Sequence, residues 1–218
     1  MSAHSLILGG VDVRRARATP LAPEDRRAAI IAATRPLLVE HGNAVTTRQI
    51  AEAAGIAEGT IFRVFADKRE LFHAVAEATV NPPGEEHALA RALADLPDLP
   101  SKLRVVVDRL AARTQEIMLV LMAVRSALVD EPQHARGDRS GPPAFLLEAN
   151  KALIDSLTDQ LFAPHAEELR LPPRKAALVL RSLTIGTWMP GLSRGEQPLS
   201  GEDIIDILLT GILRKDDH

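Results

Sequence analysis

Cysteine is absent from this chain of 218 residues, and so is tyrosine. Without cysteine there can be no disulfide bond and no thiolate metal ligand. Aromatic residues make up only 3% of the chain, with a single tryptophan. Long apolar runs are missing as well, because the longest, Ile117 to Val124, falls far short of the roughly 20 residues that a membrane-spanning helix needs. With 46% hydrophobic and 25% charged residues, the composition is that of an ordinary globular protein.

Motifs of enzymes and of metal sites are missing too. The sequence has no His-Glu-x-x-His, no glycine-rich phosphate loop and no Gly-x-Ser-x-Gly. No two histidines have the spacing of metal ligands on one helix. We therefore expect no catalytic residue, no metal site and no cofactor.

The first 22 residues reverse the order of a secretory signal. Their apolar patch, Leu6-Ile7-Leu8, comes before the arginines Arg14, Arg15 and Arg17 rather than after them. We expect a cytoplasmic protein in which residues 1–22 form a flexible arm. Charge is also divided unevenly along the chain: ten basic against eight acidic residues from Met1 through Val75, and sixteen against twenty-one in the remainder. That is the sign expected if only the N-terminal part approaches phosphate.

Helix is expected throughout, because alanine, leucine, arginine and glutamate are abundant and no segment alternates in polarity. Proline and glycine separate the segments. The stretch to Val129 should begin at a Ser101 cap and form one helix or two, and Pro36 should kink the first helix or shift its boundary. We expect helices at about residues 23–41, 46–54, 57–65, 67–80, 85–95, 101–129, 144–162, 173–189 and 201–214.

The informative segment runs from Val45 to Leu71. Thr46 and Gln49 fit a capping box at the start of a helix, and Gly55 suits the left-handed turn that ends the same helix. A helix of about two turns follows, and a second capping box at Asp67-Lys68-Arg69-Glu70 opens the next helix. Two short helices joined by a three- to four-residue turn with glycine are typical of a helix-turn-helix. The alternative is a plain helical hairpin in a core.

The second helix of such a unit presents its N-terminal half to base edges. Gly59 and Thr60 are small enough for close approach, whereas Ile56, Ile61 and Phe65 should point inward. Glu58, Thr60, Phe62 and Arg63 then point outward, with Arg63 able to bind guanine in a bidentate manner and Arg48 able to reach base or phosphate. Thr46, Thr47 and Lys68 should face phosphates. The candidate DNA-binding residues are Thr46, Thr47, Arg48, Gly59, Thr60, Phe62, Arg63 and Lys68.

As an ordered pattern, Thr46 to Leu71 resembles the DNA-binding signature of the TetR family of bacterial transcriptional regulators, and the resemblance extends over about residues 24–75. Two positions depart from the family pattern: Phe62 stands where a tyrosine usually contacts a phosphate, and Val64 is less polar than usual. The resemblance implies an all-α protein. Its three-helix DNA-binding domain would span residues 23–75, and a helical-bundle ligand-binding and dimerisation domain would span residues 76–218. The arginines of the arm are then either a solvated tail or a segment that reaches DNA.

The resemblance further implies a homodimer formed by the last two long helices, and a repressor that a small molecule releases from a palindromic operator. Those two helices carry more apolar residues than one stripe each requires, although the intramolecular core could use them all. The large apolar residues behind residue 76 predict an apolar effector, although plain core packing would explain the same residues. The candidate ligand-binding residues are Met118, Met122, Phe145, Phe162, Trp188 and Met189. The alternative function is a helical ligand-binding or scaffold protein that keeps the fold without operator recognition.

Overall fold

The computed structural model describes residues 22–128, 142–188 and 199–213. These residues form helices and one isolated antiparallel bridge between Leu169 and Leu213, which confirms the all-α expectation. In chain order the elements are α1 (Pro23–His41), η1 (Gly42–Ala44), α2 (Thr47–Ala54), α3 (Glu58–Val64), α4 (Lys68–Val80), α5 (Glu85–Leu93), α6 (Leu99–Ala127), α7 (Ala144–Ser156), η3 (Leu157–Phe162), η4 (Ala163–Glu168), α8 (Pro173–Trp188) and α9 (Gly201–Ile212). None of the described helices combines the length and apolarity that a membrane crossing requires.

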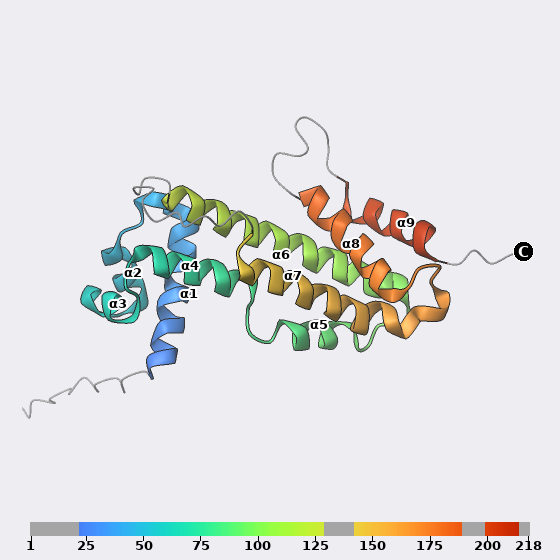
Figure 1. Cartoon of the computed structure of the whole chain (residues 1–218), viewed down its shortest axis with the longest axis horizontal. Coiled ribbons are helices and arrows are strands. Elements are labelled where there is room, and N and C mark those ends of the chain that lie inside the picture. The colour runs from blue at the N-terminus through green and yellow to red at the C-terminus, as the bar shows by residue number, and fades with distance from the viewer. Residues whose placement is uncertain (1–21, 129–141, 189–198, 214–218) are drawn as a thin grey trace, which may run out of the picture.

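The helices α1 to α4 form one end of the molecule, which we call the head (Figure 1). Its core contains buried side chains from all four helices together with Val120 and Val124 of α6. The largest of these buried side chains are Phe65 and Phe72, each about 1% exposed or less. The core of the head therefore includes the last turns of α6, and helices α1 to α4 alone do not complete it.

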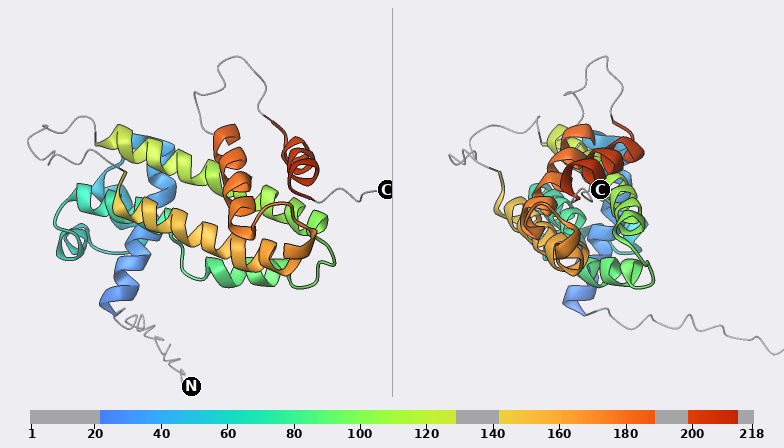
Figure 2. Two further views of the ribbon diagram at one scale, coloured as in Figure 1. Left: turned by 45° about the vertical axis from the view of Figure 1, so that its right-hand side comes forward. Right: turned by 90° about the vertical axis from the view of Figure 1, so that its right-hand side faces the viewer.

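A second core fills the rest of the molecule, which we call the body. It gathers buried residues from α5, α7, η3, α8 and α9 against the first half of α6, including Leu99, Leu103 and Phe162. Figure 2 shows α8 and α9 (orange and red) lying together at the end of the molecule opposite to α2 and α3. The body thus carries the final two long helices on its outer side.

Helix α6 takes part in both cores. Its 29 residues correspond to a length of about 43 Å. Its buried residues fall in two groups, Leu99 to Val107 in the body and Val120 with Val124 in the head, with no buried residue between them. The stretch to Val129 is thus one helix rather than two. It begins before Ser101, because Asp98 supplies the cap and Pro100 occupies the first turn, where no N–H is needed.

Proline lies in two other helical segments, and only the second of them changes its helix type. α1 continues through Pro36 from Pro23 to His41, so its boundary is not shifted. The expected helix at 144–162 is α-helical only to Ser156; a π-helical turn, η3, and the 3₁₀ segment η4 follow. Pro164 lies in η4, where its ring disfavours continued α-helix.

Candidate DNA-binding interface and effector domain

The start of α2 is fixed by a complete capping box, as the sequence predicts. The backbone N–H of Gln49 donates to Thr46 Oγ1 at 3.2 Å, and the backbone N–H of Thr46 donates to Gln49 Oε1 at 2.8 Å. At the other end, Gly55 adopts a φ of 66° and its N–H donates to the carbonyls of Ala51 and Glu52. Both ends of this short helix are therefore closed by local hydrogen bonds.

Helix α3 is anchored on one side and open on the other. Ile61 and Phe65 are buried in the head core, and Ile56 packs against it, so all three inward assignments are confirmed. Glu58, Gly59, Phe62 and Arg63 are exposed. Phe62 keeps 52% of its surface accessible, and nothing lies within 4 Å of a Cβ placed on Gly59. The unit is therefore not a hairpin enclosed in a core, because α3 presents a free face to solvent.

The basic side chains of this region differ in how they are held. Arg48 Nε lies 3.3 Å from Glu52 Oε1, one turn along α2. Arg27 of α1 lies over the Phe65 ring, 4.4 Å from its centroid, and 3.6 Å from Glu70. Within residues 22–128, 142–188 and 199–213, Arg63 makes no hydrogen bond or ion pair. Its guanidinium is therefore available to an external acceptor.

Lys68, in the first turn of α4, contacts two other residues of the head. Its Nζ donates to the Val45 carbonyl at 2.7 Å and lies 5.2 Å from the centroid of the Phe72 ring. Asp67 caps the helix as expected, accepting from the Glu70 N–H at 2.7 Å. The reciprocal bond differs from the predicted capping box, because Glu70 accepts from the N–H of Ala66 rather than of Asp67.

The structure brings the eight candidate DNA-binding residues to the same end of the head. They lie at the start of α2, along α3 and at the start of α4, and Figure 1 shows these helices at the end remote from α9. Several of them bind other residues of the head: Thr46 binds Gln49, Thr47 donates its hydroxyl to the Glu58 carboxylate, and Lys68 binds Val45. Sequence analysis missed the bonds made by Thr47 and Lys68, because both join residues far apart in the chain.

The four candidate ligand-binding residues whose side chains are described do not share one cavity. Phe162 is fully buried in the body core, whereas Phe145 packs against the head core. Met118 is half-buried, and Met122 is 57% exposed on α6. Trp188 ends α8, and Met189 lies outside the described residues.

Two hollows of the described surface are lined mostly by residues with polar or charged side chains. The larger, of about 390 Å³, follows α7 and η3, and the smaller, of about 280 Å³, lies between α5 and α6. The larger is lined by Glu148, Lys151, Ala152, Asp155, Ser156, Asp159 and Gln160; the smaller is lined by Glu85, Arg109, Ala112, Arg113 and Glu116. Neither lining includes Met118, Met122, Phe145 or Phe162, the four candidates whose side chains are described.

Four side-chain atoms of α7, η3 and α8 are buried without a hydrogen-bond partner: Asn150 Oδ1, Ser156 Oγ, Gln160 Oε1 and Arg181 Nε. Burial lowers the pKa of the Arg181 guanidinium from its ordinary value. Nearby, ion pairs with Lys151 and Arg174, each 2.6 Å from Asp155, lower the pKa of that carboxyl. The signal that could have revealed Asn150 is a polar residue inside the apolar stripe of α7, between Leu146 and Ile154.

Polar side chains also join the head to the body. Arg113 of α6 donates to the Thr79 carbonyl of α4 and pairs with Glu116, and Glu116 pairs with Arg35 of α1. The Arg113 side chain is only 21% exposed, whereas that of Glu116 is 41% exposed, and both residues are engaged.

Comparison with known proteins supports this arrangement. Residues 30–75 match the family model described as bacterial regulatory proteins, tetR family. NalD, the secondary repressor of the MexAB-OprM multidrug efflux pump in Pseudomonas aeruginosa, shares 23% identity over 89% of this chain and 98% of its own, with a TM-score of 0.52.

Two further solved structures have the same fold. A TetR-family transcriptional regulator from Agrobacterium tumefaciens is 17% identical over 88% of this chain and 100% of its own, with a TM-score of 0.54. A SmeT–triclosan complex is 21% identical over 88% of this chain and 93% of its own, with a TM-score of 0.52. The chain therefore carries a match to bacterial regulatory proteins of the tetR family over residues 30–75, and it shares its helical fold with these solved structures.

Proposed function

We propose that this protein is a ligand-responsive transcriptional repressor that binds a palindromic operator as a homodimer. The observation that carries the proposal is the free face of α3, with Ile61 and Phe65 anchoring it from behind and Phe62 and Arg63 exposed in front. A helix held in this way fits the major groove of DNA. In this proposal residues 23–75 are the DNA-binding domain and residues 76–218 the ligand-binding and dimerisation domain.

The dimer is proposed to form through the outer faces of α8 and α9. Most apolar residues of α9 belong to the body core, including Ile204, Ile205 and Leu208, so the intramolecular explanation accounts for them. Leu178 and Val179 of α8 and Ile207 of α9 remain, with 42%, 36% and 45% of their surfaces exposed. These side chains are apolar surface that a second copy of the chain would remove from water.

The effector is proposed to be a small, largely apolar molecule that binds the body. SmeT, which has the same fold, is described in complex with triclosan, and NalD as a repressor of a multidrug efflux pump. Because α6 belongs to both cores, a ligand that shifts α6 in the body also changes the position of the head. Different affinity for the two arrangements is sufficient to couple ligand and DNA.

Selection from random double-stranded DNA tests the DNA-binding part. We expect enrichment of an inverted repeat whose half-sites lie about 34–36 Å apart, one helical turn of DNA. Failure to enrich any sequence would favour the alternative, a ligand-binding or scaffold protein without operator recognition. Phe62 and Val64 of α3 depart from the family pattern, and these two departures are what favours that alternative.

A thermal-shift series with apolar, polar and charged compounds tests the effector part. A compound that stabilises the protein is then titrated with and without the selected operator. Operator should weaken its binding by the same factor as the compound weakens operator binding. Stabilisation by highly polar compounds alone would contradict an apolar effector, and equal affinities in the two titrations would contradict the switch.

A further inference from the structure

Glu58 carries an uncompensated negative charge on the face of α3 that the proposed function directs towards DNA. It is the first residue of α3 and is exposed. Its Oε1 accepts a hydrogen bond from the hydroxyl of Thr47. Two other acids of the head have a basic partner: Glu52 pairs with Arg48, and Glu70 with Arg27. For Glu58, the described part of the chain provides only the neutral hydroxyl of Thr47.

A carboxylate in this position restricts what α3 can contact. The phosphates of DNA repel it, and it can only accept hydrogen bonds. In the major groove, the donors are the exocyclic amino groups of cytosine and adenine. The adenine amino group lies beside N7, an acceptor that repels a carboxylate, whereas cytosine itself presents no acceptor on this edge. Cytosine is therefore the base that fits Glu58 best.

We propose that Glu58 is a specificity-determining residue that accepts a hydrogen bond from the N4 amino group of one cytosine in each half-site. This inference rests on the proposed function, because it requires α3 to enter the major groove. Thr47 is a positioning residue in it: its hydroxyl binds one carboxylate oxygen and leaves the second for the base.

A purely structural role for Glu58 would consist of its bond to Thr47, which ties the start of α2 to the start of α3. Glutamine separates the two roles. Its side-chain carbonyl can still accept from the Thr47 hydroxyl, but its amide also donates, and glutamine pairs with adenine through N6 and N7. Glu58→Gln should therefore keep the fold while changing the preferred base.

The test compares the sequences that wild type, Glu58→Gln and Glu58→Ala select from random double-stranded DNA. The full chain is used, and thermal unfolding establishes that each variant is folded. We expect a cytosine at one position of each wild-type half-site, with a preference over other bases of about tenfold or more. Glu58→Gln should shift that position towards adenine, and Glu58→Ala should lose the preference there while retaining the remaining positions.

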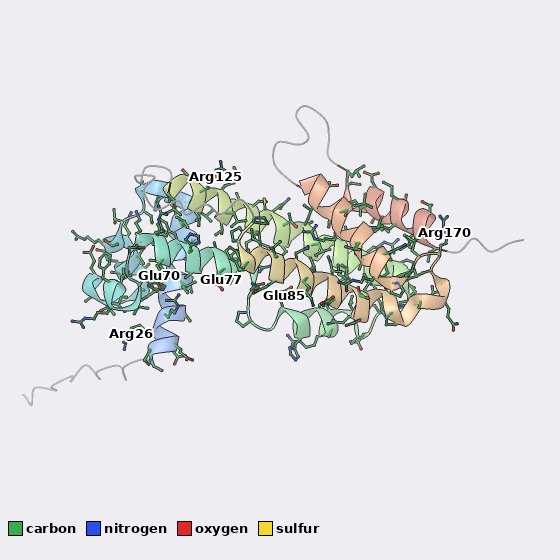
Figure 3. The ribbon with its side chains drawn as sticks, in the orientation of Figure 1. Arg26, Glu70, Glu77, Glu85, Arg125 and Arg170 are labelled. Atoms are coloured by element: carbon green, nitrogen blue, oxygen red, sulfur yellow. The ribbon has the colours of Figure 1, made fainter. Side chains whose placement is uncertain are left out.

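Glu77→Gln is the matched control. Glu77 is an exposed carboxylate of the same head, but it lies further along α4, away from α3 (Figure 3). Its substitution should leave the selected sequence unchanged. Thr47→Val should weaken the cytosine preference and Thr47→Ser should restore it, because serine keeps the hydroxyl; a phosphate contact alone would not change one base position selectively.

Two results would overturn the inference. If Glu58→Gln selects the wild-type sequence at every position, Glu58 does not contact a base, although the protein remains an operator-binding regulator. If wild type selects no sequence, the proposed function fails and the inference fails with it. The wild-type arm thus distinguishes the two failures, and Glu58→Gln remains decisive if Glu58→Ala does not fold.

Discussion

Arg35 of α1 and Glu116 of α6 form an ion pair, with 2.9 Å between Arg35 Nη1 and Glu116 Oε1. The other oxygen of the same carboxylate lies 3.0 Å from Nη1 of Arg113, whose second nitrogen reaches the Thr79 carbonyl at the end of α4. One carboxylate therefore joins the first helix of the head to the middle of α6. It lies within the part of α6 that carries no buried residue.

A double-mutant cycle of Arg35→Ala and Glu116→Ala should give a coupling energy of about 0.2–1 kcal/mol, because both side chains are partly exposed to water. Urea unfolding of the four proteins measures it. Salt near 1 M should reduce the coupling, since the Debye length is then only about 3 Å. Additive effects of the two substitutions at low salt would show that the pair contributes nothing.

Arg63→Ala should weaken operator binding by about 1–3 kcal/mol and relax the preference at one base pair per half-site, because its guanidinium is free and faces outward on α3. Fluorescence titration with the selected operator and its single-base variants measures both effects. Arg170→Ala is the control, since Arg170 lies at the far end of the molecule (Figure 3). Equal losses on operator and random DNA would show that Arg63 contacts only phosphate.

Lys68→Met should lower the free energy of unfolding by about 1.5–3 kcal/mol, because it removes the charged donor to the Val45 carbonyl while keeping the stem near Phe72. Urea unfolding without DNA measures the change. The sequence suggested a phosphate contact for Lys68, which would instead weaken binding to all DNA and flatten its salt dependence. Unchanged unfolding with weaker DNA binding would favour the phosphate contact.

Leu178→Glu or Ile207→Glu should split the proposed homodimer, because both side chains are exposed on the outer face of α8 and α9. Sedimentation velocity at micromolar concentration should show a dimer for wild type and a folded monomer for each variant. Leu147→Glu is the control, with a comparable exposure of 55% on α7. A wild-type monomer would contradict the assembly. Leu208 is unsuitable for this test, since it is fully buried and a charge there would unfold the body.

Acid should lower the free energy of unfolding, because it protonates Asp98, the N-cap residue of α6. Its hydrogen bonds with Ser101, first of all that from the Ser101 N–H, hold the pKa of Asp98 below its ordinary value of 3.8. The unfolded chain therefore takes up the proton first as the pH falls. The stabilisation is complete above the unfolded-state pKa near 3.8 and is lost as the pH falls through the lower folded-state pKa.

Asp98→Asn keeps a capping side chain but cannot ionise. Thermal unfolding of wild type and Asp98→Asn should therefore differ most near neutral pH, and the difference should shrink as the pH falls below about 4. A difference that stays constant between neutral pH and about pH 2 would show that ionisation of Asp98 does not contribute.

Local chemistry was predictable from the sequence where partners are close in the chain. Thr46 with Gln49, and Gly55 at the end of α2, occupy the expected conformations, because caps and left-handed turns depend on neighbouring residues. The inward side of α3 followed from helical spacing and is confirmed by Ile61 and Phe65. The start of α6 was missed, because Asp98 and Ser101 both suit an N-cap and only the path of the chain selects between them.

The body was less predictable, because its apolar residues exceed what local patterns can assign. Large apolar residues such as Phe162 and Leu208 are equally typical of a ligand pocket, a subunit interface and a core. Both are fully buried in the body core. The contacts of Thr47, Lys68 and Arg113 join residues 11, 23 and 34 positions apart, so no local rule could indicate them. Whether the six candidate pocket residues bind a ligand remains a prediction.

Because α6 is packed into both cores, it connects movements of the body to movements of the head. Close-packed cores do not deform continuously, so a displacement of about 1–2 Å at its body end must reach the head as a tilt or a translation. In a symmetric dimer both subunits would move in this way, so both displacements would change the distance between the two α3 helices. The repeat of DNA, in contrast, stays near 34–36 Å. A molecule bound beside Leu103 could therefore release an operator without contacting any residue that touches DNA.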